Sequence, residues 1–209
     1  MKKMKIIWLI LCVSGLTNNV NSQSGLTFDA SQSFSSFKFS DSQGDKQNKE
    51  YSGIFCGAYG IGYRINMEKG LIINSGIGMR KGGATLEYDE MNYSWNLQYV
   101  FGKIGVGYML KKEKISPYCI LNGYYAYLIK GFQIINNEEF DIRKAESLKN
   151  TDYGVYLTPG VQFTLSEEVS AYIEAGYLMG LQNIEKDESQ KATNFSYSMT
   201  IGLSFTFTK

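Results

Sequence analysis

Strict alternation of apolar and polar residues runs through residues 153–165 and again through residues 169–181. Every odd-numbered position in these two segments is apolar or aromatic, and the glycine, serine, threonine, glutamine and glutamate residues all lie at even numbers. A period of two sustained over this length indicates β-strands longer than those of most soluble sheets. Only residues 166–168 separate the segments, which predicts a tight antiparallel hairpin with one apolar face.

The same alternation predicts further strands at residues 26–40, 51–65, 71–82, 93–110, 117–132 and 193–208. Two of them are irregular. The aromatic face shifts between Phe34 and Phe37, and the apolar positions move from odd numbers, between Tyr93 and Phe101, to even numbers beyond Gly102. We therefore predict a β-bulge near Gly102 and place the odd-numbered residues before it on the apolar outer face.

The connections between the strands alternate in length. Long polar connections follow residues 40, 82, 132 and 184, whereas short ones follow residues 65, 110 and 165. Long loops at one end and short turns at the other are typical of outer-membrane barrels. We therefore expect an all-β fold, an eight-stranded antiparallel up-and-down transmembrane β-barrel, over residues 23–209.

A soluble ligand-carrying barrel is the competing architecture, with apolar faces turned inward around a cavity. The last strand argues against it, because its polar face consists of asparagine, serine, threonine and glycine without a single lysine or glutamate. Such a face is unusual for a surface in water, so the pattern favours a barrel whose apolar side meets lipid.

Residues 1–22 have three lysines at the start, an apolar core from Ile6 to Leu16 and small polar residues before Gln23. This order predicts a secretory signal peptide cleaved after Ser22, and hence export from the cytoplasm. A membrane anchor would need a longer apolar run, and a lipoprotein cut before Cys12 is disfavoured by the bulky Leu11.

The composition narrows the possible functions. The sequence contains no histidine and has a formal net charge of +1. Imidazole-dependent catalysis and histidine metal sites are therefore excluded, and no electrostatic argument supports a nucleic-acid partner. We expect no enzyme activity, no cofactor and no metal.

Two local features have structural interpretations. Glycine-rich runs at Gly57 and Gly76 resemble phosphate-binding loops, but neither leads from a strand into a helix or ends in Gly-Lys-Ser/Thr. We interpret them as glycines that make room inside a narrow barrel. Cys56 is expected to point inward and Cys119 outward on separate strands, so both are expected to be packing residues without a disulfide.

Charged residues are also expected inside the barrel. Arg64, Arg80 and Glu174 fall on inward faces, and Lys130 is a further candidate. Because an isolated charge is costly to desolvate, we predict that these residues form an ionic plug that fills the lumen. An ion or solute path is the alternative, although eight strands leave an interior that side chains can fill.

Residues 133–151 form the longest stretch without periodicity, and their polar composition predicts a mobile loop. Because outer-membrane barrels keep their short turns on the periplasmic side, this loop is expected outside the cell. The candidate surface recognition residues are Glu138, Asp141, Arg143, Lys144 and Lys149.

At this point the chain resembles the small outer-membrane β-barrel proteins of Bacteroidetes, of the porin-like or PorT-like type. The resemblance lies in GAYGIGYRI, GLIINSGIGMRKGG, SPYCILNGYYAYLI and the hairpin DYGVYLTPGVQFTL with EVSAYIEAGYLMGLQNI, and it covers nearly the whole mature chain. It implies the outer membrane of a Gram-negative bacterium and names no active site. Some relatives are linked to protein secretion.

Two classes of function follow from these expectations. One is a structural or surface-binding protein that contacts outer-membrane lipid and an extracellular or secretion-machinery partner through its long loops. The other is a narrow porin-like channel or an accessory component of protein secretion.

Overall fold

The structure, a computed structural model, describes residues 23–40, 43, 51–88, 91–112, 114–145, 147–187 and 189–207. The expected signal peptide, residues 1–22, lies outside the described residues. The strands are β1 (Gln23–Ser40), β2 (Tyr51–Asn66), β3 (Leu71–Tyr88), β4 (Met91–Met109), β5 (Ile115–Ile135), β6 (Glu138–Asp141), β7 (Thr151–Thr164), β8 (Val169–Gly180) and β9 (Lys191–Phe207). Among the described residues, no helix has the length and apolarity needed to cross a membrane.

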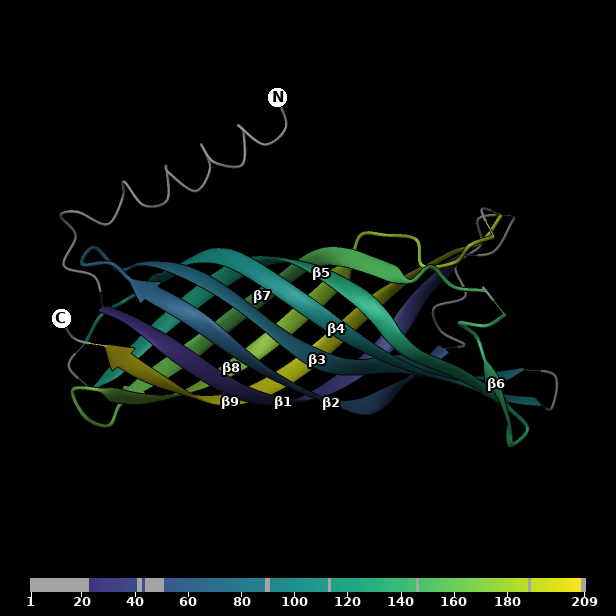
Figure 1. The fold of residues 1–209 in the computed structure, drawn as a ribbon, viewed down its shortest axis with the longest axis horizontal. Coiled ribbons are helices and arrows are strands. Elements are labelled where there is room, and N and C mark those ends of the chain that lie inside the picture. The colour runs from purple at the N-terminus through teal and green to yellow at the C-terminus, as the bar shows by residue number, and fades with distance from the viewer. Residues whose placement is uncertain are drawn as a thin grey trace, which may run out of the picture.

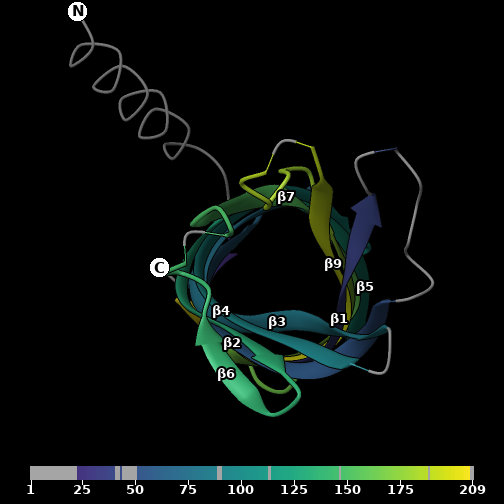
Figure 2. The same cartoon turned by 90° about the vertical axis from the view of Figure 1, so that its right-hand side faces the viewer.

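All strands except β6 form one closed ring. The order is β4-β3-β2-β1-β9-β8-β7-β5, and pairing of β4 with β5 closes it. Figure 1 shows the long tilted strands, and Figure 2 shows the ring from one end. Neighbouring strands are antiparallel throughout, and the seam between the first and last strands runs from Ser24 opposite Phe207 to Ser40 opposite Lys191. The predicted eight-stranded up-and-down barrel is confirmed.

The short turns gather at one end of the barrel, where the described chain also begins and ends (Figure 1). In the β2–β3 turn, Gly70 has φ of 86°, a backbone conformation that only glycine adopts at little cost, and its N–H donates to the carbonyl of Met67. The β7–β8 turn is closed by backbone bonds from Leu165 and Ser166 to the Val169 carbonyl. These turns hold the registers of the hairpins they join.

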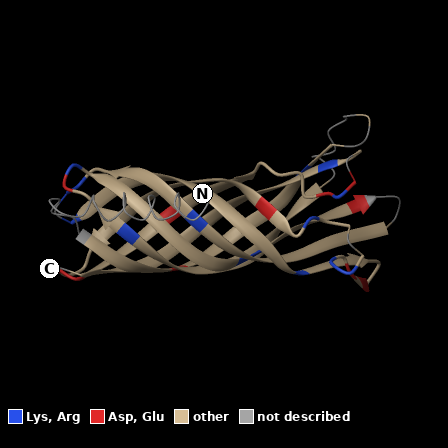
Figure 3. Cartoon of the chain, turned by 45° about the horizontal axis from the view of Figure 1, so that its top comes forward, with Lys and Arg blue, Asp and Glu red and all other residues tan. Residues whose placement is uncertain are grey.

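A belt of apolar side chains surrounds the outside of the barrel. Its most exposed members on the strands are Phe55, Tyr59, Ile77, Ile104, Val106, Tyr125, Tyr197, Met199 and Ile201. Figure 3 shows most of the barrel wall without charged residues, with many of the charges near the two ends. Such a belt suits hydrocarbon rather than water, and a closed ring leaves no backbone edge unpaired in lipid. The outer surface is therefore that of a membrane-spanning barrel.

The prediction for β4 is wrong in its first half. Leu97 and Tyr99 are 1% exposed and belong to the buried core, whereas the even-numbered Val100 lies on the outer surface. The pairing of β4 with β3 is continuous through Gly102, and the irregularity falls instead between β4 and β5, where Ile129 is the extra residue. The apolar residues change side because β4 leaves the belt and enters a region where the barrel interior is apolar.

The same change of side explains the irregular pattern of β1. Phe28 and Phe34 are exposed on the belt, whereas Phe37 and Phe39 are buried inside near the long loops. Cys56 is buried, and Cys119 is exposed on the outer face; both are free thiols, as the sequence predicted.

The belt makes a prediction about substitutions on β9. Ile201 is 66% exposed and pairs with belt residues on both sides, whereas Thr193 lies opposite Lys38 near the edge of the belt. Ile201→Arg is expected to lower the free energy of unfolding from lipid vesicles by about 2–4 kcal/mol, and Thr193→Arg by about 0–1 kcal/mol. Urea titrations monitored by tryptophan fluorescence measure both. Equal costs at the two positions would contradict the membrane-spanning assignment.

Candidate functional site

The barrel interior is crossed by two buried ion pairs, each held between two tyrosine rings. In the first, the Arg64 guanidinium on β2 donates to the Glu174 carboxylate on β8 at 2.9 Å. The Tyr118 hydroxyl donates to the same carboxylate oxygen at 2.7 Å. The rings of Tyr118 and Tyr172 lie 4.8 Å from the guanidinium carbon, one contact from each ring. We call this group the Arg64 plug.

The second ion pair repeats the arrangement nearer the long loops. Arg80 on β3 donates to Asp152 on β7 at 2.6 Å, and Tyr124 donates to the same carboxylate oxygen at 3.1 Å. The rings of Tyr99 and Tyr124 lie 4.7 and 5.2 Å from the guanidinium carbon. Asn194 adds a third donor to Asp152 at 3.0 Å. We call this group the Arg80 plug.

The structure places all three predicted lumen residues inside the barrel, but not in one cluster. Glu174 pairs with Arg64, and Arg80 pairs with Asp152, a residue absent from the predicted set. The predicted alternation begins at residue 153 and assigns Asp152 to neither face. Asp152 precedes the inward Gly154 by two positions, so extending the alternation to residue 152 would have placed it on the inner face. Lys130 does not join either plug, because it is exposed on the outside beyond the irregularity at Ile129.

A small polar chamber separates the two plugs. Lys103 and Asp29 form a third ion pair there at 3.7 Å, and the hydroxyls of Ser31 and Thr200 lie 2.7 Å apart. The remaining cavity has a volume of only about 50 Å³. This is room for a few water molecules at most. Arg80 lines the chamber, and its Nε has no hydrogen-bond partner among the described residues.

Apolar side chains close the interior on both sides of the plugs. Toward the short turns the buried cluster consists of Ile72, Met109, Tyr118, Ile120 and Tyr172. Toward the long loops the larger cluster consists of Phe37, Phe39, Ala84, Leu97, Tyr99, Tyr124, Ala126, Leu128, Ile142, Leu148, Leu178, Ile184 and Ala192. Thus the lumen is filled by side chains over much of its length.

The long loops contribute to this closure. Leu148 and Glu185 form an antiparallel bridge, and the Lys149 N–H donates to the Ile184 carbonyl at 2.7 Å. Leu148 and Ile184 are buried in the same cluster as lumen residues of the strands. We call residues 142–150 and 181–190, apart from the undescribed positions 146 and 188, the loop cap. The expectation of a wholly irregular loop at residues 133–151 is therefore corrected, since β5 runs to Ile135 and β6 follows.

Two carboxylates in the loop cap have shifted pKa values. Burial raises the pKa of Glu185, and the negative charge of Asp187 raises it further. The pKa of Asp187 is lowered, because the backbone and side chain of Ser189 donate to its carboxylate. Since a raised carboxyl pKa favours the protonated folded form, the contribution of Glu185 to stability grows as the pH falls, and that of Asp187 declines.

The predicted recognition residues lie mainly on β6 and the turn after it. Glu138 is exposed and Asp141 is half-buried, and the Asp141 carboxylate accepts backbone N–H bonds from Arg143 at 3.1 Å and Lys144 at 3.3 Å. Lys149 is separate from this group and half-buried in the loop cap. Among the described residues, no group of histidine, cysteine or carboxylate side chains could hold a metal ion.

Comparison with solved structures identifies the fold. OprG of Pseudomonas aeruginosa matches with a TM-score of 0.56 at 10% identity, over 90% of this chain and 97% of that one. Neisserial surface protein A matches with a TM-score of 0.53 at 11% identity, over 87% and 97%. The chain has the fold of the small outer-membrane β-barrel proteins. No protein-family model and no curated protein sequence matches this barrel.

A double-mutant cycle tests the pairing within this barrel. Glu174→Gln is expected to lower the free energy of unfolding by about 3–5 kcal/mol, because Arg64 is left buried without its partner. The exposed Glu167 supplies the control, since Glu167→Gln should change stability by less than about 0.5 kcal/mol.

The cycle also distinguishes two plugs from one cluster. Arg64→Met combined with Glu174→Gln, and Arg80→Met combined with Asp152→Asn, should each show coupling within about 0.5–3 kcal/mol. Arg80→Met combined with Glu174→Gln should show less. Coupling as large between Arg80 and Glu174 as within the pairs would favour the single cluster.

Proposed function

We propose that the protein is an exported outer-membrane β-barrel with a closed lumen, whose folded loops bind a protein partner at the cell surface. The proposal rests on the series of barriers that follow one another along the barrel interior. Two ion pairs join opposite walls of the barrel, apolar clusters lie on both sides, and the loop cap packs into the larger cluster. A lumen filled in this way supports a binding role over diffusion of solutes.

The surface that the long loops present contains regular secondary structure. Strand β6 pairs with β5 on one side, and no described strand pairs with its other edge. Glu138, Glu139 and Phe140 are exposed along it, and Phe140 is 46% exposed. An aromatic side chain flanked by charges on a rigid scaffold suits recognition of a protein, and the resemblance to secretion-linked barrels suggests a secretion component as one such partner.

Conductance tests the closed lumen. In planar bilayers the wild-type barrel is expected to show no single-channel steps, because the polar chamber holds only about 50 Å³ and plugs lie at its ends. Replacing Arg64, Glu174, Arg80 and Asp152 with serine should open a water path and produce steps, provided that the variant still migrates as a folded barrel. Steps from the wild-type protein would favour the narrow channel instead.

Protease access in intact cells tests the orientation. The Lys144 side chain is 86% exposed beyond β6, so trypsin should cut after it from outside the cell. The exposed Lys111 and Lys112 at the short-turn end should be cut only after the outer membrane is permeabilised. A photo-crosslinking residue at Phe140 should capture a protein on intact cells, and one at Leu165 should not capture the same protein. The reverse pattern of cleavage would contradict the proposed orientation.

A further inference from the structure

A row of polar side chains crosses the outer wall of the barrel on three adjacent strands. Lys81 on β3 lies directly opposite Gln98 on β4, and Gln98 lies directly opposite Lys130 on β5. Both lysines are exposed, on the side of the wall that carries the apolar belt. Residues directly opposite each other on neighbouring strands share a face, so the two lysine positions flank the Gln98 position on the outer wall.

On β3, β4 and β5 the row follows the last outward apolar residues before the long loops. On β3 the outward positions from Leu71 to Met79 are apolar except for Ser75, and Lys81 is the next. On β4 the outward run from Tyr108 ends at Val100, and Gln98 is the next. The row therefore lies at the depth where lipid headgroups meet the acyl chains.

A further cation reaches the same place from the loop side. The Arg143 guanidinium donates to the backbone carbonyl of Ile129 at 2.5 Å, beside Lys130. Among the described residues, no carboxylate lies within ion-pair distance of Lys81, Lys130 or Arg143. Three cations that have no counter-ion in the described part of the chain, at a membrane interface, are complementary to an anionic headgroup.

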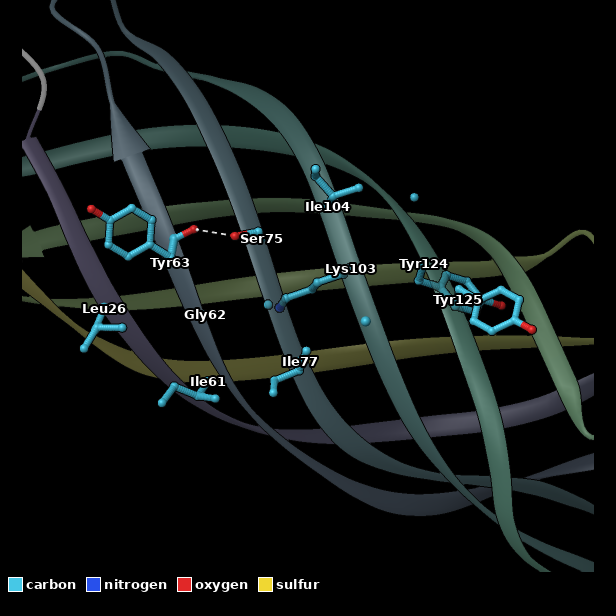
Figure 4. Close-up of a pocket in the computed structure, with 13 residues that line it drawn as sticks. Leu26, Ile61, Gly62, Tyr63, Ser75, Ile77, Lys103, Ile104, Tyr124 and Tyr125 are labelled. Atoms are coloured by element: carbon cyan, nitrogen blue, oxygen red, sulfur yellow. Dashed lines mark hydrogen bonds between the residues drawn. The ribbon is translucent and has the colours of Figure 1, made fainter. Parts of the chain in front are cut away.

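The belt below the row is hollowed. Gly102 on β4 and Gly123 on β5 face outward. A Cβ atom added at either glycine would have a backbone carbonyl oxygen, 4.0 Å away, as its nearest neighbour. They open a hollow of about 810 Å³, and Figure 4 shows Ile77, Ile104 and Tyr125 among the residues that line it. A smaller hollow of about 360 Å³ adjoins Lys81, Gln98 and Lys130.

We propose that this face binds a lipid with a phosphate-bearing headgroup. Lys81, Lys130 and Arg143 contact the phosphates, Gln98 donates between the two lysines, and an acyl chain lies in the hollow over Gly102 and Gly123. The proposal rests on the membrane-spanning barrel and its orientation, and it is independent of the closed lumen.

The test is lipid binding in detergent by native mass spectrometry. The probe is lipid A, a diphosphorylated glucosamine-disaccharide lipid, compared with the same lipid after removal of its phosphates. Lys81→Met with Lys130→Met is expected to weaken binding of the phosphorylated lipid by about 30-fold, the factor expected for two lysines at a membrane surface. Lys111→Met with Lys112→Met, at the opposite end, is the matched control and should bind as the wild-type protein does.

A second variant tests the hollow. Gly102→Leu with Gly123→Leu fills it from the open side and should weaken binding of the same lipid without loss of the folded band on unheated gels.

Undiminished binding by the Lys81→Met/Lys130→Met variant, or equal wild-type affinity for the dephosphorylated lipid, would overturn the headgroup site. Undiminished binding by the glycine variant would overturn the acyl-chain assignment. None of these substitutions should alter conductance, so failure here is distinguishable from failure of the closed-lumen proposal.

Discussion

The cost of placing charge in a narrow, dry interior shapes this barrel. A guanidinium removed from water needs neighbouring groups that replace its contacts with water, and Arg64 and Arg80 find such groups in the same way. Each meets a carboxylate from the opposite wall, lies between two tyrosine rings, and shares that carboxylate with a tyrosine hydroxyl. Because β2 is tied to β8 and β3 to β7, the pairs connect strands that share no backbone hydrogen bonds. The two ion pairs thus link strands of the ring across the barrel interior.

The second constraint is the change of solvent along the strands. Where lipid surrounds the barrel, apolar side chains point outward and the interior is polar; where the strands rise toward the loops, Phe37, Leu97 and Leu128 point inward. That upper part is a small soluble-type core built from the same strands. The loop cap completes this core with Leu148 and Ile184, which explains why polar loop sequence contains buried residues.

Local alternation was sufficient to predict much of this architecture. Successive residues of a strand point to opposite faces, so the alternation predicted that Arg64 and Glu174 point inward. It also predicted the hairpin at residues 153–181. The sequence did not show which charged residues pair with each other. Whether Glu174 or Asp152 pairs with Arg80 depends on the stagger of strands around the closed ring. The side change in β4 resembled a bulge because the sequence gives no direct sign of where lipid ends.

The seam between β1 and β9 has a consequence for assembly. Hairpin pairs such as β7–β8 join residues that are close in the chain, but the seam joins Ser31 to Thr200 across a sequence separation of 169. The entropy of closing so long a loop is lost before the ring gains its final row of hydrogen bonds. Ring closure therefore depends on the pairing of β1 with β9, the first and last strands of the described chain. Until these strands pair, their outer edges remain open to any chaperone or insertase that offers a strand.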